Sequence, residues 1–444
     1  MVMHLYIHGG QVIDGTGEVP FAASVLVRDD KIVAVGQEAD QQVMHLDQVK
    51  RIDASGLTVM PGLIDSHCHL SFDDASSNLE IFHQRRNALS ALVASYNAKK
   101  VLRAGVTSIL DPDSVFANSL DLRDAINAGY VEGPRMACGA YALITGVGGT
   151  AGNLIADEGV TGYYRVVHGE NEIIREVRRQ IKEGVDWIKV HVSGVVPHYA
   201  HLGERCSWSQ KELDLVCEVA HDMGVPVMGH CRGAEAVKRA VKADFDMLFH
   251  ATGMDEEAVK AVIDKRIPVC PSLTFQANIA DFGAQIGTSQ ALIDLFKNEI
   301  QESVEPMKRL IAAGVPLICG SESGFTAVPY GDWHHREMEV FVKYFGMTPL
   351  QAIRSATADN AFAMKMSGEL GLIKPGCYAD ILCIEGDPSQ QISLLGETRL
   401  IHHVIKNGQQ LDLSPLPAHT RLSGWHIPTM GQRISKSAVM PAFN

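Results

Sequence analysis

The 444-residue sequence lacks a long apolar run, a C-x-x-C pair and an excess of basic residues. A membrane-spanning helix needs about 20 consecutive apolar residues, so the sequence predicts no membrane segment. The formal net charge of −13 argues against nucleic acid or anionic lipid as a partner. The N-terminus also lacks a basic start followed by an apolar core, so we expect no secretory signal and a cytoplasmic protein.

Cysteine usage gives no sign of a disulfide framework. The nine cysteines are odd in number and irregular in spacing, and several lie inside apolar, strand-like runs. This pattern is typical of small buried side chains in a reducing compartment. A hydrophobic content of 46% with 20% charged residues indicates a globular protein with a large core.

Short strand patterns occur near both ends of the chain. Residues 4–53 alternate strand-like runs with Gly and Asp turn signals, and strands return after residue 366 at 379–384 and 401–408. We predict that residues 1–58 and 366–444 fold together as one small β-sandwich domain, with residues 59–365 inserted between them.

The inserted region alternates apolar strand-like runs with helical stretches. Continuous apolar strands that alternate with helices predict a parallel sheet covered by helices, an α/β fold. Eight such units favour a closed (β/α)₈ TIM barrel, whose chemistry lies at the C-terminal ends of its strands. The eight runs span 59–66, 106–110, 135–143, 187–192, 226–231, 247–251, 267–273 and 315–320.

The first of these runs ends in His67-Cys68-His69. Alternate residues of a strand share a face, so the two imidazoles would lie side by side and form half of a divalent-metal site. The pair alone is weak evidence, because two polar side chains on a solvated strand would look the same.

Later predicted strands end in further metal-binding or titratable residues: Lys189 and His191, then His230, His250 and Glu322. Any one of them could be structural, but together at one barrel mouth they predict a metal site. We expect His191 to support a ligand rather than to bind metal.

Three residues are candidates for substrate binding. Arg232 could pair with a substrate carboxylate, and His198 and Tyr141 could hydrogen-bond a substrate carbonyl. A helix-start charge and solvated loop positions are the alternative interpretations.

Several motifs spread along nearly the whole chain carry a family resemblance. They are Gly10-x-Val-Ile-Asp-Gly15, Met60-Pro-Gly-Leu-Ile-Asp-Ser-His-Cys-His69, Gly105-Val-Thr-Ser108, Trp187-Ile-Lys189, His230, His250 and the Gly371–Asp380 stretch. Together they resemble the amidohydrolase superfamily, in the branch of imidazolonepropionases, Xaa-Pro and Xaa-Arg dipeptidases and ochratoxin-type amidases.

The resemblance implies roles for the residues at the strand ends. His67 and His69 would bind one divalent metal, and a carboxylated Lys189 would bridge to a second metal held by His230 and His250. The imidazole-rich set favours zinc. The family usually has Asp where this chain has Glu322, so one or two ions remain possible, and Glu322 would act as a ligand, as the base, or as both.

The predicted function is metal-dependent hydrolysis of a C–N amide bond in a small substrate, such as an N-acyl amino acid or a dipeptide. Glu322 would take a proton from the attacking water and pass it to the leaving amine. One alternative is hydrolysis of a urea, carbamate or cyclic amide, including xenobiotics. A non-enzymatic alternative, a barrel scaffold that has lost catalysis, is favoured only by the Asp-to-Glu departure. We expect a homo-oligomer.

Overall fold

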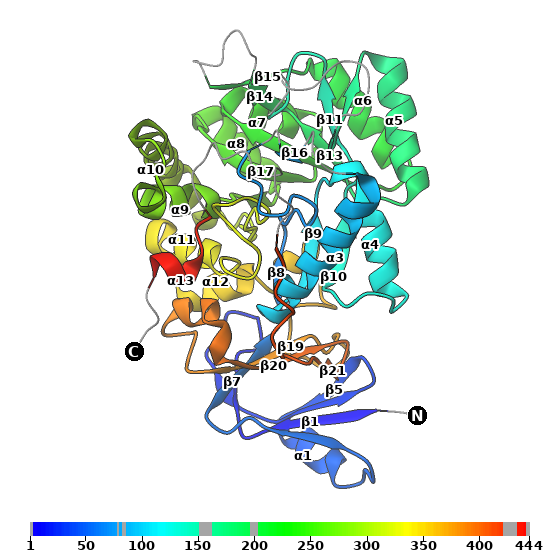
Figure 1. Ribbon diagram of the computed structural model, residues 1–444, viewed down its shortest axis with the longest axis vertical. Coiled ribbons are helices and arrows are strands. Elements are labelled where there is room, and N and C mark those ends of the chain that lie inside the picture. Colours follow the sequence, from blue (N-terminus) through cyan, green and yellow to red (C-terminus); the bar gives the residue numbers. More distant parts are fainter. Residues whose placement is uncertain are drawn as a thin grey trace.

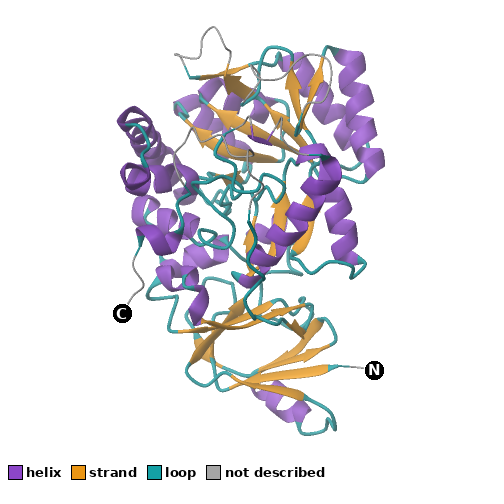
Figure 2. Ribbon diagram, viewed as in Figure 1, coloured by secondary structure: helices purple, strands orange, loops and turns teal. Residues whose placement is uncertain are grey.

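The computed structural model describes residues 3–77, 80–81, 86–150, 162–195, 203–420 and 433–440. Figures 1 and 2 show a body of strands and helices above a smaller part made mainly of strands. Strands from both ends of the chain, blue and orange in Figure 1, lie together in the smaller part.

Within the described residues, seven parallel strands of the larger body fall into two consecutive sets. Three of them form a sheet in the order β10-β9-β8, and the others lie consecutively in the order β13-β16-β17-β18. Their bounds are β8 (Leu63–Asp65), β9 (Val106–Asp111), β10 (Arg135–Cys138), β13 (Ile188–His191), β16 (Val227–Arg232), β17 (Met247–Thr252) and β18 (Val269–Cys270).

Backbone hydrogen bonds join these two sets of strands. The amide of Asp186, just before β13, donates to the carbonyl of Cys138 at the end of β10, at 2.8 Å. On the other side, residues 316–319 lie between β18 and β8. There the amide of Ile318 donates to Val269 at 2.9 Å, and the amide of Ser66 donates to Cys319 at 2.9 Å. The larger body is therefore a TIM-barrel-like α/β fold.

The interior and the helix layer are both apolar. Inward-facing residues from several strands, including Ile64, Leu110, Met228, Met247 and Ile318, form one buried cluster. The covering helices are α3 (Asn87–Arg103), α4 (Asn118–Asn127), α5 (Glu170–Glu183), α6 (Gln210–His221), α7 (Ala234–Lys242), α8 (Glu256–Lys265), α9 (Thr274–Phe282), α10 (Gln290–Ala312), α11 (Arg336–Phe345) and α12 (Pro349–Ser355).

The run at 135–143, expected as one strand, is divided into β10 and β11 (Ala142–Thr145). The chain turns at Gly139, where an added Cβ would lie 2.0 Å from the carbonyl oxygen of Pro112. β11 then pairs with β12 (Tyr164–Val167) and contacts β13 at one residue pair, Leu143 with Val190. A hairpin of β14 (Ser193–Val195) and β15 (Glu204–Cys206) follows β13.

The smaller part contains two sheets, in the orders β21-β20-β19-β7-β2-β3 and β5-β4-β1-β6. β19, from the C-terminal region, pairs antiparallel with β7, from the N-terminal region. The elements of the smaller part are β1 (His4–His8), β2 (Gln11–Val12), β3 (Phe21–Ala22), β4 (Val25–Arg28), β5 (Lys31–Val35), α1 (Gln37–Val43), β6 (Lys50–Asp53), β7 (Leu57–Pro61), β19 (Ile381–Glu385), β20 (Ile401–Lys406) and β21 (Gln409–Gln410). The short helix α13 (Lys436–Val439) lies beside α11 and α12 of the larger body (Figure 1).

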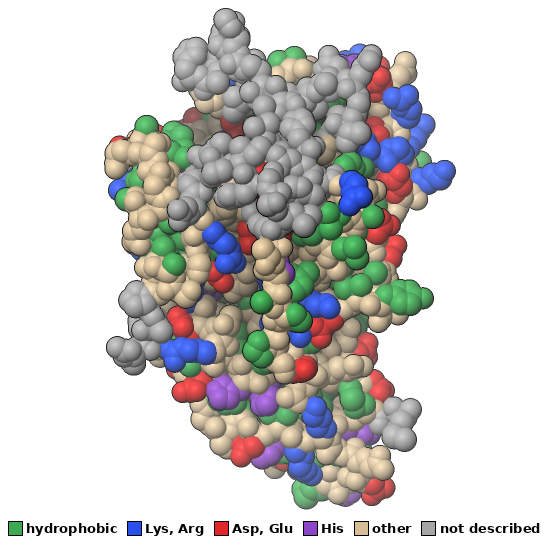
Figure 3. Space-filling model, viewed as in Figure 1, with side chains coloured by type: hydrophobic (Ala, Val, Ile, Leu, Met, Phe, Trp, Pro, Cys, Tyr) green, Lys and Arg blue, Asp and Glu red, His purple; other side chains and the backbone are tan. Residues whose placement is uncertain are grey.

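Gly62 is the junction between the two parts, since β7 ends at Pro61 and β8 begins at Leu63. A Cβ at Gly62 would lie 2.1 Å from the Thr107 hydroxyl, so this close approach to β9 requires glycine. The helices within the described ranges include none with the length and apolar character needed to span a bilayer. Among the coloured residues in Figure 3, acidic and basic side chains are interspersed on the visible face.

Candidate active site

The predicted histidines converge at the C-terminal ends of their strands. The ring of His67 lies 4.8 Å from that of His69 and 5.5 Å from that of His250, measured between centroids. The rings of His230 and His250 are 4.5 Å apart. Lys189 Nζ is buried beside them, 3.8 Å from the centroid of Phe249. Four strands thus bring five of the predicted residues into one cluster.

Glu322 joins this cluster from the segment after residue 320. A ligand atom from each of His67, His250 and Glu322 lies within 4.8 Å of the other two, a spacing that could hold a metal ion. The backbone amide of Glu322 donates to the carbonyl of His67 at 2.6 Å. The longer side chain of Glu, in place of the usual Asp, therefore still reaches the histidines.

The backbone is strained at several positions around the cluster. His250, Ala251, Ser272 and Glu322 have φ angles of 65°, 49°, 51° and 57°, in the left-handed region that non-glycine residues rarely adopt. Such conformations cost about 1–3 kcal/mol each and concentrate at functional sites.

Three of the histidines are oriented through one ring nitrogen. His67 Nδ1 is hydrogen bonded to the hydroxyl of Ser272 at 2.7 Å, and His69 Nδ1 donates to the backbone carbonyl of Asp113 at 3.0 Å. His230 Nε2 bonds to a Glu204 carboxylate oxygen at 2.8 Å. Among the described residues, no hydrogen bond to the other nitrogen of these rings is seen, which is the usual arrangement of metal-binding histidines.

His250 differs, because neither of its buried ring nitrogens has a hydrogen-bond partner among the described residues. Burial also lowers the pKa of His250 well below its usual value, with Arg232 and His230 adding to the effect, so the ring is neutral. Leaving a buried polar atom unpaired costs about 1–3 kcal/mol. A neutral, unpaired imidazole beside His67 and Glu322 fits a divalent metal.

The Glu322 carboxylate is suited to proton transfer. Removal from water raises its pKa to about 7, although Arg232, His69 and Lys189 act in the opposite direction. A group that titrates near neutral pH can both accept and donate a proton during turnover.

Arg232, a predicted substrate-binding residue, is paired within the protein. Its guanidinium forms an ion pair with Glu299 on α10, and its Nε lies 3.6 Å from a carboxylate oxygen of Glu204. A substrate carboxylate would have to compete with these two side chains, so the substrate-binding role stays a prediction.

The structure adds no support for the other two predicted substrate-binding residues, Tyr141 and His198. Tyr141 lies between β10 and β11, and its ring packs against Arg165 at 3.6 Å and Arg179 at 5.5 Å, toward α5. His198 lies outside the described residues. His191 is close to the site, and its ring stacks on His230 at 4.8 Å.

Sequence reasoning missed Asp113, Ser272 and Glu204. Asp113 follows β9, so extending the strand-end rule to the second barrel strand would have found it. The same rule applied to β18 would have found Ser272, which follows that strand. Glu204, in β15, had no comparable signal.

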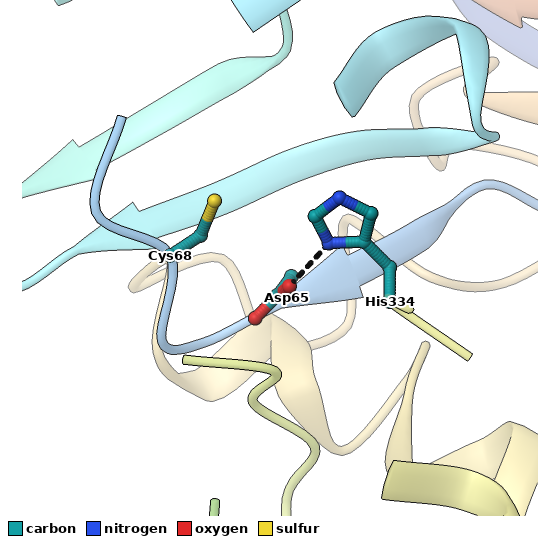
Figure 4. Close-up of side chains that lie close together, drawn as sticks. All are labelled: Asp65, Cys68 and His334. Atoms are coloured by element: carbon teal, nitrogen blue, oxygen red, sulfur yellow. Dashed lines mark hydrogen bonds and ion pairs between the residues drawn. The ribbon is translucent and has the colours of Figure 1, made fainter. Parts of the chain in front are cut away.

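Asp65, Cys68 and His334 form a second group with metal-ligand spacing (Figure 4). His334 Nδ1 donates to Asp65 at 2.7 Å, and His334 Nε2 accepts from the Gly331 amide at 3.1 Å. Asp65 also accepts from the amides of His67 at 3.0 Å and Ser321 at 2.9 Å. These hydrogen bonds engage the Asp65 carboxylate and both ring nitrogens of His334. They also connect β8 to the segment that carries Glu322.

We expect His334→Ala to lower the free energy of unfolding by about 1–3 kcal/mol, because it removes a donor from a buried carboxylate. Urea denaturation would measure the change. His402→Ala is a suitable control, since that exposed histidine pairs with Glu385 on the small part and should matter by less than about 0.5 kcal/mol. Equal stability of the two variants would contradict the supporting role.

Known proteins are similar to this chain in sequence and in fold. The family described as the Amidohydrolase family matches residues 58–411. Ochratoxinase from Aspergillus niger is 28% identical over 435 residues, covering 91% of this chain and 85% of that protein. Imidazolonepropionase from Thermoplasma volcanium is 22% identical over 428 residues, covering 87% of this chain and 89% of that protein.

Solved structures agree with this match. The crystal structure of A. niger ochratoxinase has a TM-score of 0.78 at 26% identity, covering 92% of this chain and 95% of that chain. A Xaa-Pro dipeptidase with bound methionine in its active site has a TM-score of 0.79 at 26% identity, covering 92% of this chain and 100% of that chain. The chain belongs to the amidohydrolase family, and it is a hydrolase that acts on carbon–nitrogen bonds.

Proposed function

We propose that this hydrolase depends on a divalent metal and cleaves the amide bond of a small substrate, such as an N-acyl amino acid or a dipeptide. The observation that carries the metal dependence is the pair of buried ring nitrogens on His250, which have no hydrogen-bond partner within the described part of the chain and lie beside His67 and Glu322. The similarity to a Xaa-Pro dipeptidase and to ochratoxinase supports a small amide substrate.

The histidines at the strand ends would hold one or two metal ions together with Glu322 and Lys189. Imidazole-rich sites of this kind suit zinc. A divalent metal bound there would lower the pKa of a water molecule toward neutrality and polarise the substrate carbonyl.

Lys189 would join the ligand set after carboxylation. Burial lowers the pKa of its ammonium, although Asp113 and Glu322 act in the opposite direction. The neutral amine can form an N–C bond to carbon dioxide and lose a proton, which converts a cationic side chain into an anionic oxygen ligand.

Glu322 would carry the proton during hydrolysis. Its carboxylate accepts a proton from the attacking water and returns it to the amine as the C–N bond breaks. His67, His69 and His230 would keep their orientation through Ser272, Asp113 and Glu204.

The architecture that we infer around the site is a closed (β/α)₈ barrel of residues 59–365. The backbone hydrogen bonds at Asp186, Ile318 and Ser66 support this closure. The two sheets built by both chain ends support a β-sandwich domain of residues 1–58 and 366–444.

A panel of N-acyl amino acids, dipeptides, ureas, carbamates and cyclic amides tests the proposal. Purified protein should hydrolyse the amides and dipeptides best, lose more than about 10³-fold of this activity after exhaustive chelation, and regain it with added zinc. Preference for ureas or carbamates would favour the alternative substrate class, and failure on the whole panel would favour a scaffold. Full activity without metal would overturn the metal dependence.

A further inference from the structure

Asp113 is a buried carboxylate beside the histidine cluster, and the proposed function gives its side chain no role so far. It follows β9, the second barrel strand, and its side chain is 2% exposed. It faces His69 from β8 and Lys189 and His191 from β13, so it connects two strands of the site.

The contacts of Asp113 with His69 fix that ring. His69 Nδ1 lies 3.0 Å from the backbone carbonyl of Asp113 and 3.2 Å from its carboxylate oxygen Oδ1. A carbonyl oxygen can only accept, so Nδ1 carries a proton, and in the neutral ring Nε2 carries the lone pair. The ring of His69 therefore presents Nε2 for metal binding.

The second carboxylate oxygen of Asp113 faces the neighbouring strand. Oδ2 lies 3.8 Å from Lys189 Nζ and 3.4 Å from His191 Nε2. An ionised Asp113 balances the Lys189 ammonium and can accept the remaining Nζ–H once the amine is carboxylated.

We propose that Asp113 is a positioning residue for the metal site: its carboxylate lies 3.2 Å from His69 Nδ1 and 3.8 Å from Lys189 Nζ, and aligns both side chains for one divalent ion. The inference rests on the proposed function, because it assigns a task to Asp113 only if the histidine cluster binds metal. Carboxylates that orient metal-binding histidines from behind typically change metal affinity by 10–100-fold when they are removed.

A matched control lies two residues away. Asp111 is also buried, but its Oδ2 accepts only from the Leu70 amide, at 3.2 Å, among the hydrogen bonds of the described residues. Burial raises the pKa of Asp111 to about 8, so this side chain is largely protonated at neutral pH. Asn closely mimics a protonated Asp, and Asp111→Asn therefore changes the local charge little.

The experiment titrates metal-free protein with Co²⁺ and follows the visible absorption of the bound ion, with a competing chelator to obtain the dissociation constant. Asp113→Asn should bind Co²⁺ about 10–100-fold more weakly and shift the absorption bands. Asp111→Asn should match the wild-type affinity and spectrum.

Wild-type affinity and spectrum in a folded Asp113→Asn protein would overturn the role of Asp113 and leave the proposed function intact. Failure of the wild-type protein to bind Co²⁺ would instead overturn the metal site itself. If Asp113→Asn does not fold, Asp113→Glu serves as the test. Its carboxylate is displaced by one methylene, so shifted bands would support the proposal and an unchanged spectrum would contradict it.

Discussion

Replacement of Glu322 by Gln is expected to lower kcat by about 10²–10⁴-fold while the histidines still bind metal. The amide of Gln cannot take a proton from water at neutral pH, although its shape is nearly that of Glu. Single-turnover and steady-state assays on the best amide of the panel, with metal content measured by mass spectrometry, would separate the lost chemistry from lost metal.

The pH dependence gives a second view of the same residue. As base, Glu322 must be ionised, so activity should fall as the pH decreases through its pKa, which is about 7 before any metal binds and lower once a cation is present. Glu302→Gln removes the same charge from an exposed position on α10 and should leave kcat unchanged. Full activity of Glu322→Gln would reject the assignment of this residue as base.

Lys189→Ala is expected to reduce the metal content and to destabilise the protein. The variant removes the proposed bridging ligand and leaves the buried Asp113 carboxylate without its 3.8 Å partner. In the metal-free protein with uncarboxylated Lys189, loss of one member of this buried ion pair costs about 3–5 kcal/mol. Metal analysis and urea denaturation would measure the two effects independently.

Lys182→Ala provides the control for Lys189, since Lys182 is exposed on the last turn of α5. Wild-type protein equilibrated with ¹³C-bicarbonate should show a carbamate carbonyl signal that Lys189→Ala lacks. An unchanged metal stoichiometry in Lys189→Ala would remove the bridging role, whatever the effect on stability.

The role of Glu322 illustrates how a departure from a family pattern becomes interpretable only in three dimensions. The sequence raises the question of whether Glu can substitute for the usual Asp. The amide of Glu322 is bound to the carbonyl of His67, and its carboxylate lies within metal-ligand distance of His67 and His250. Glu322 meets the two histidines from a left-handed backbone position, with a φ of 57°.

Local patterns of the sequence determined the alternation of strands and helices and the identity of the histidines, Lys189 and Glu322 as strand-end residues. Such patterns have periods of two or about 3.6 residues and can be recognised within a single segment. The family resemblance of the motifs then indicated a hydrolase of carbon–nitrogen bonds, as the matching relatives support.

The tertiary structure alone decided which side chains support and neutralise the site. Asp113 lies 3.8 Å from Lys189, which is 76 residues away in the chain, and Arg232 forms an ion pair with Glu299. These pairs form because the parallel segments are joined edge to edge and because α10 packs near the end of β16, and no local period encodes such contacts. Local sequence patterns identify the candidate ligands, whereas the packing of distant segments determines the orientation of these side chains and the charges around them.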